Sequence, residues 1–221
     1  LFHTGDTAVI LRMHYHNKEA FFTDRHLDLN VYDQYLQFNQ LLTDKTGTPL
    51  AALTATNSII SSTQTNNMSF VQPLTGVVTR IGLPTLKNLA SIGKFFKVMR
   101  ASMTIEPIGG TYSPPFTLPP ALTLCEVDKN NYVTDTLRGA YGESQYGDLI
   151  IDKLFQEDTR YIYDITQYCK NEIASPEAFT RQLILIPPSS SYYSSLDRAV
   201  LGDGKNKKYK ISVQVQYLLY N

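Results

Sequence analysis

The chain has 221 residues with 20 basic and 20 acidic side chains, so its formal net charge at pH 7 is zero. This balance argues against a nucleic-acid-binding protein, which carries a basic excess or a basic stripe. The 15 Tyr and 10 Phe residues, with many Thr, Ser, Asn and Pro, are typical of short β-strands joined by polar loops. The sequence contains no run of about 18 apolar residues, so it predicts no membrane span.

The amino-terminal stretch from Thr7 to His16 is predicted to be a strand, because apolar and polar residues alternate along it. His14 and His16 lie on the same face, and His26 follows after a polar turn. Two histidines spaced two apart on a strand point the same way and can bind zinc when a third ligand is near. The alternative interpretation is a solvated strand face.

The next two segments have weaker patterns. Asp28 to Thr43 is ambiguous between strand and helix, and Asp44 to Asn67 is a Thr-, Ser- and Asn-rich excursion without a strong period. The excursion is either a binding surface or disordered. We therefore predict that residues 1–67 are the end of a preceding β unit with a long connection, and that residues 68–221 form a β-sandwich domain.

From Met68 the predicted elements become regular. We expect strands over Ser69 to Ile81 and Lys94 to Glu106, with a short amphipathic turn after Pro84 between them. The apolar phase shifts between Val98 and Ala101, which predicts a β-bulge near Arg100.

A further strand is predicted over Ala121 to Val127, followed by a tight turn over residues 128–131. Asp128, Asn130 and Asp135 carry the oxygen ligands that calcium prefers, and they are a candidate calcium site. The alternative is that they are ordinary turn residues, because Asp and Asn side chains hydrogen-bond their own backbone.

The stretch from Tyr161 to Ile186 is predicted to be a strand, a short crossing helix capped by Thr166, and a buried central strand. Ser175 and Pro176 end the helix, because a residue before proline is displaced from the α region. Ser189 to Ser195 is predicted to be a loop. The last strand, Lys210 to Tyr220, is expected to be exposed and to pair with another subunit or with a missing amino-terminal part.

The order of these segments resembles the carboxy-terminal half of domain-of-unknown-function family 4270, a family of Bacteroidota envelope lipoproteins. The resemblance is carried by GVVTRIGLPTL, KVMRASMTIEP, PALTLCEVD, YIYDITQYCK, RQLILIP and ISVQVQYLLY, in that order. It implies an outer-membrane-anchored protein at the cell surface or in the periplasm. The lipidated cysteine of the family is not in this chain, so membrane attachment is implied only through an anchor outside it.

The expected fold is all-β: a jelly-roll-like antiparallel β-sandwich with one or two short helices. The same succession of strands also resembles jelly-roll sandwiches appended to extracellular enzymes and adhesins, many of which bind glycans. That likeness concerns fold and does not define function.

No catalytic signature is present, and we expect neither an enzyme nor a cofactor. The sequence has no Gly-x-Ser-x-Gly elbow and no Cys/His nucleophile pattern. A group of acidic residues lies close in sequence, but the strand phase scatters its members, which are Asp152, Glu157, Asp158 and Asp164.

Two functions of different class follow. The preferred one is a non-enzymatic envelope module that acts in protein interaction or assembly, with an outer-membrane protein as partner. The alternative is a glycan-binding module, in which exposed loop aromatics stack on sugar rings; the candidates are Tyr112, Phe116, Tyr192 and Tyr193.

Cys125 and Cys169 are the only cysteines. They either pair in an oxidising compartment or remain two separately buried thiols. We favour separate thiols, because Cys125 is predicted on a strand and Cys169 on a helix.

Overall fold

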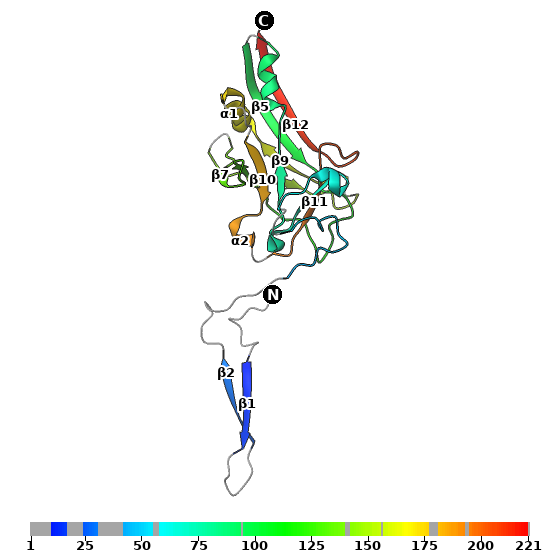
Figure 1. The fold of residues 1–221 in the computed structure, drawn as a ribbon, viewed down its shortest axis with the longest axis vertical. Helices are drawn as coiled ribbons and strands as arrows, with labels where there is room; N and C mark the ends of the chain where they lie inside the picture. The colour runs from blue at the N-terminus through cyan, green and yellow to red at the C-terminus, as the bar shows by residue number, and fades with distance from the viewer. Residues whose placement is uncertain are drawn as a thin grey trace. The chain divides into compact units, whose positions relative to one another are not determined.

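The structure of the protein is a computed structural model (Figure 1). It describes residues 10–16, 24–30, 42–54, 58–93, 95–139, 142–155, 157–176, 181–192 and 195–220. The chain divides into two compact units, Leu1–Thr43 and Asp44–Asn221. The excursion that we grouped with the first part of the chain therefore belongs to the second compact unit, where Asn67 accepts a hydrogen bond from the Asp203 N–H at 3.0 Å.

The described part of the first unit is an antiparallel hairpin of β1 (Ile10–His16) and β2 (Asp24–Asn30). Its two faces differ because side chains alternate along a strand. Leu11, Met13 and Leu29 lie on an exposed apolar face, while His14 is opposite His26 on the other face.

The second unit has an all-β, sandwich-like fold built from antiparallel sheets, as the sequence predicted. One four-stranded sheet has the order β4-β10-β6-β7, and the other has the order β12-β5-β9-β8. The strands are β4 (Thr79–Ile81), β5 (Phe95–Ile105), β6 (Thr123–Val127), β7 (Val133–Thr136), β8 (Asp148–Ile150), β9 (Arg160–Asp164), β10 (Gln182–Ile186) and β12 (Ile211–Tyr220). A two-stranded sheet joins β3 (Met68–Val71) to β11 (Ala199–Gly202).

Side chains from both four-stranded sheets meet in the main apolar core. Met103 and Ile105 come from β5, Tyr163 from β9, Leu124 from β6 and Leu185 from β10, and all five are almost completely buried. Two tyrosine hydroxyls satisfy backbone carbonyls inside this core: Tyr161 donates to Pro119 O at 2.6 Å and Tyr163 to Leu122 O at 2.8 Å. These bonds fix the chain that leads into β6.

The predicted strand, helix and core strand are confirmed as β9, α1 (Thr166–Ala174) and β10. The predicted cap was wrong. Thr166 is the first residue of the helix, and its hydroxyl accepts a hydrogen bond from the Ala101 N–H in β5, while the Asp164 carboxylate accepts the Thr166 N–H. The hydroxyl therefore joins the helix to the neighbouring strand.

The bulge predicted near Arg100 is also confirmed. Gln216 of β12 pairs with Arg100, whereas Tyr217 pairs with Val98, so Met99 is an extra residue in β5. Beyond this point β5 has a strand partner on one side only, because β9 pairs with Ser102 to Ile105. Residues 95–100 and 216–220 thus form a two-stranded ribbon, which we call the distal ribbon, at the end of the sheet near the C terminus (Figure 1).

Short helical turns occupy several connections. Ser69 to Ile81, predicted as one strand, is divided into β3 and β4 by the 3-10 turn η3 (Pro73–Thr75), because Pro73 cannot donate to a ladder. The turn η2 (Ser62–Thr65) precedes β3, and η4 (Leu86–Ser91) fits the turn expected after Pro84. The loop predicted over Ser189 to Ser195 was wrong in part, since it begins with the helical turn α2 (Ser189–Tyr192).

Candidate binding sites

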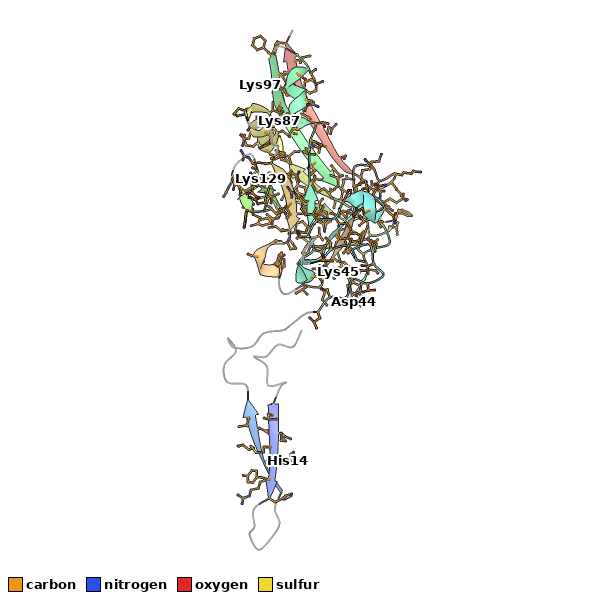
Figure 2. All side chains as sticks on the ribbon, in the orientation of Figure 1. His14, Asp44, Lys45, Lys87, Lys97 and Lys129 are labelled. Atoms are coloured by element: carbon orange, nitrogen blue, oxygen red, sulfur yellow. The ribbon has the colours of Figure 1, made fainter. Side chains whose placement is uncertain are left out.

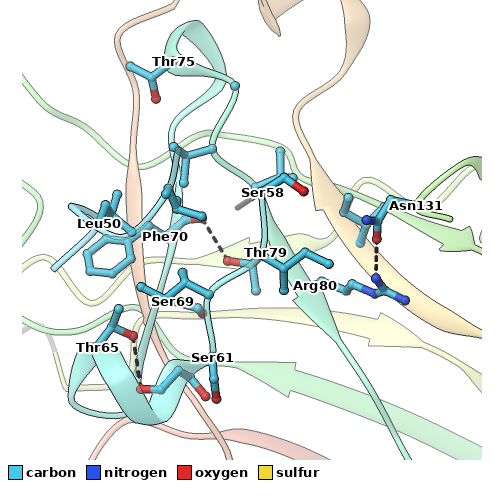
Figure 3. Close-up of a pocket in the computed structure, with 18 of the residues that line it drawn as sticks. Leu50, Ser58, Ser61, Thr65, Ser69, Phe70, Thr75, Thr79, Arg80 and Asn131 are labelled. Atoms are coloured by element: carbon cyan, nitrogen blue, oxygen red, sulfur yellow. Dashed lines mark hydrogen bonds between the residues drawn. The ribbon is translucent and has the colours of Figure 1, made fainter. Parts of the chain in front are cut away.

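A groove of about 1000 Å³ lies in the second unit (Figure 3). It lies between the excursion and the strands β3, β4 and β10. Its walls combine apolar side chains with many hydroxyl and amide groups; the lining includes Leu50, Leu53, Ser58, Ser62, Phe70, Thr79, Arg80, Asn130, Asn131 and Gln182. A volume of this size lies within the range of ligand-binding clefts.

One wall of the groove is fixed by short-range backbone geometry. Pro73 and the left-handed Gly76 turn the chain back on itself, so β4 returns beside β3. The Thr79 hydroxyl then donates to Phe70 O at 3.0 Å and ties the two segments together (Figure 3). At the other wall, the Ser61 hydroxyl accepts the Thr63 N–H and caps η2. The groove is therefore framed by hydrogen-bonded turns.

A third segment reaches the groove from the connection between β6 and β7. Asp128 Oδ1 accepts the N–H groups of Asn130 and Tyr132 at 2.8 and 2.9 Å, which closes a tight turn. Asn131 adopts a left-handed conformation with φ of 67° in this turn. Its side-chain oxygen accepts a hydrogen bond from Arg80 Nη1 (Figure 3). The turn thus orients the guanidinium group of Arg80.

The charged side chains that line the groove are all cationic. Lys45 and Arg80 line it, and none of its lining residues is Asp or Glu. Neither cation forms an ion pair with a residue in the described parts of the chain. The nearby Asp44 carboxylate, labelled beside Lys45 in Figure 2, instead accepts the Thr46 N–H at 2.8 Å.

Two buried polar atoms on the groove residues have no hydrogen-bond partner among the residues that the structure describes. They are Arg80 Nε and Ser69 Oγ. Buried polar groups in folded proteins are nearly always hydrogen-bonded, so an unpaired donor in the wall of a groove is unusual.

The free edge of β12 is a second candidate site. β12 is an outer strand of its sheet, and within the described residues its backbone pairs with β5 alone. Its ten residues contain no Pro, Gly or charged side chain. The distal ribbon also exposes large apolar side chains, among them Phe95, Met99, Tyr217, Leu218 and Tyr220.

The aromatic residues selected from the sequence do not form an open platform. Tyr112 was expected to be exposed, and this was wrong: its side chain is buried in the core cluster. The Arg198 guanidinium lies 4.1 Å from the centroid of the Phe116 ring and covers that face. Tyr192 is half-buried in α2, and Tyr193 lies outside the described residues. Sugar binding at this loop stays a prediction.

The structure brings two of the three predicted histidines together. His14, labelled in Figure 2, is directly opposite His26 in the hairpin, and the two ring centroids are 6.0 Å apart. His16 lies two residues along the same face. Among the described residues, no three His, Cys, Asp or Glu side chains are grouped as metal ligands. Asp128 is engaged in its turn, and Asp135 accepts the Thr136 N–H at 2.8 Å.

The acidic residues before β9 are each engaged separately. Asp152 accepts backbone N–H groups of Phe155, Leu154 and Glu157, and these hydrogen bonds, that of Phe155 first, hold the pKa of Asp152 below its usual value. Glu157 pairs with Lys208 at 3.0 Å. Each of these two carboxylates therefore has its own partners, Asp152 within the loop before β9 and Glu157 in the turn before β12.

A buried carboxylate pair lies elsewhere and was missed from the sequence. Glu172 of α1 is almost fully buried and accepts the Arg181 N–H at 2.9 Å, while Arg181 Nη1 lies 2.9 Å from Glu126. Burial raises the pKa of Glu126, against the lowering effect of Arg181. The one feature of the sequence that could have indicated this buried carboxylate is the position of Glu172 among apolar residues of the predicted helix. The arrangement joins α1 to the sheet.

Cys125 and Cys169 are separate, buried thiols, as the favoured interpretation predicted. Cys169 packs in the main core, whereas Cys125 lies in a second apolar cluster with Val127 and Ile184. Burial raises the pKa of Cys169 to about 12.

None of the helices in the described residues has the length and apolar character that a membrane crossing requires. Comparisons with family models, curated proteins and solved structures gave no match to the chain. Membership of family 4270 accordingly stays a prediction.

Proposed function

We propose that the chain is a non-enzymatic module of a cell-envelope lipoprotein that acts in protein interaction or assembly. In this proposal the free edge of β12 accepts an extended, mainly uncharged strand from an outer-membrane partner protein. Strand addition of this kind supplies affinity through backbone hydrogen bonds and specificity through alternate side chains.

The observation that carries the proposal is the contrast between β12 and the other outer strands of the two large sheets. β4, β7 and β8 have 3, 4 and 3 residues, whereas β12 has 10. Charged residues make up 18% of the chain, so a typical ten-residue stretch contains about two of them, yet β12 contains none. Proteins usually protect sheet edges with short strands, charges or proline. The unprotected length of β12 is consistent with a surface that a partner strand covers.

Site-specific photo-crosslinking in the native envelope tests this proposal. A photoreactive residue replaces Gln214 or Gln216, which are exposed on β12, and a matched one replaces Val133, which is exposed on the outer strand β7. We expect the same discrete adduct from both β12 positions and none from Val133. Amide hydrogen exchange should also slow in β12 when the partner is bound. Absence of a β12 adduct, or equal adducts from Val133, would refute the proposal.

A further inference from the structure

The groove beside the excursion has chemistry of its own, separate from the β12 edge. We infer that it is a binding site for an acidic saccharide, with Arg80 as the group that recognises the carboxylate. The inference does not rest on the strand-addition proposal, because the two sites share no residue.

The charge of the groove indicates an anion. Lys45 and Arg80 line it without a partner carboxylate among the described residues, and no acidic side chain lines it. In a concave site with walls of lower dielectric, such unbalanced cations create a positive potential that attracts anionic ligands. Asp128, in the turn that carries Asn130 and Asn131, forms no ion pair with Lys45 or Arg80 among the described residues; its Oδ1 accepts two backbone N–H groups.

The geometry of Arg80 favours a carboxylate. Asn131 accepts from Nη1 and thereby fixes the plane of the guanidinium group, while the Nε donor has no partner in the described chain. Nε and Nη2 form the side edge of the fork, which binds the two oxygens of a carboxylate in parallel hydrogen bonds. A carboxylate that reaches this edge supplies the partner that the enclosed Nε donor lacks.

The rest of the lining favours a hydroxylated body for the ligand. Ser58, Ser62, Asn130 and Gln182 present hydroxyl and amide groups, which both donate and accept hydrogen bonds. Phe70 adds an aromatic ring to the same site. Alternating hydroxyl groups and apolar ring faces are the properties of a sugar, so the combined chemistry fits a uronic-acid residue better than a simple anion.

Titration calorimetry with the whole chain tests the inference, using tetragalacturonate and its fully methyl-esterified form as probes. The two probes have the same backbone and differ in charge. We expect the acid to bind and the ester to bind about 10- to 100-fold more weakly, the effect of losing one charged hydrogen-bonded pair. Equal binding of both forms, or binding of neither, would overturn the inference.

Matched variants locate the site. Arg80→Gln should weaken binding of tetragalacturonate about 10- to 100-fold, Arg80→Lys should weaken it less, and Arg100→Gln, which removes the same charge from the exposed surface of β5, should leave it unchanged. Asn131→Gly keeps the left-handed turn but frees the guanidinium, so it should also weaken binding. Thermal melts confirm that each variant is folded. Unchanged binding in folded Arg80→Gln, or preferential binding of a tetraglutamate peptide, would refute the saccharide assignment at this groove.

Discussion

The turn that leads into β12 provides the sharpest stability test. Gly202 ends β11, and a Cβ atom placed on it would lie 1.8 Å from the backbone oxygen of Tyr209 and 2.8 Å from its carbonyl carbon. Real Cβ contacts essentially never fall below 3.0 Å, so Gly202→Ala requires a displacement of about 1.2 Å. The displaced atoms belong to the backbone, so no side-chain rotation relieves the clash.

Tyr209 is also held within the turn, since its N–H donates to Asn206 Oδ1 at 3.1 Å. Overpacking of this kind costs about 1–3 kcal/mol, and each lost hydrogen bond adds about 1 kcal/mol. We therefore expect Gly202→Ala to lower the free energy of unfolding by about 3 kcal/mol, which corresponds to a fall in Tm of about 6–12 °C.

Gly204→Ala is the matched control in the same turn. A Cβ atom placed on Gly204 would lie 3.8 Å from Ile211 O, an ordinary contact distance. Because alanine also restricts the unfolded chain, we expect a change of less than about 1 kcal/mol, in the stabilising direction. Urea denaturation and thermal melts followed by circular dichroism measure both variants. Equal stability of Gly202→Ala and Gly204→Ala would refute the packing of this turn against β11.

Three further predictions concern the core. Tyr163→Phe should cost about 1–2 kcal/mol in urea denaturation, because it leaves Leu122 O without its donor, whereas Phe at the exposed Tyr146 should cost nothing measurable. The raised pKa of Glu126 means that its contribution to stability is present below about pH 4.5 and is lost as the pH rises through the folded-state pKa. In Glu126→Gln, the free energy of unfolding should therefore fall less steeply with pH above pH 4.5 than in the wild-type protein. The same slope in both proteins would contradict this. Alkylation without reductant should add no label to the native protein at pH 8 and two after denaturation, since both thiols are buried and unpaired; one label or none after denaturation would exclude separate thiols.

Much of the fold could be predicted because its signals are local. Pro176 marks the end of α1, the run Leu183 to Leu185 marks a buried strand, and the phase shift after Val98 marks the bulge. Each of these follows from the period of a strand or helix and from proline geometry.

The candidate sites depended on contacts that no local pattern encodes. Arg80 and Asn131 are 51 residues apart in sequence, and their hydrogen bond exists only because β4 and β6 both flank β10. Tyr112 and Glu172 were misjudged or missed for the same reason. The sequence shows Tyr112 in a Pro-rich loop, but its burial depends on how that loop packs on the core. The sequence likewise shows Glu172 on a helix, but its burial depends on the position of Arg181.

The groove is assembled from three segments that are distant in sequence, and most of its polar lining stands outside the main apolar core. Recognition and folding are therefore encoded by largely separate sets of positions. A library selected for thermal resistance will tolerate many changes at Ser58, Ser62 and Asn130, whereas a library selected for ligand capture will not. Related chains that keep the same strands can consequently diverge in what they bind through substitutions in the excursion and in one tight turn.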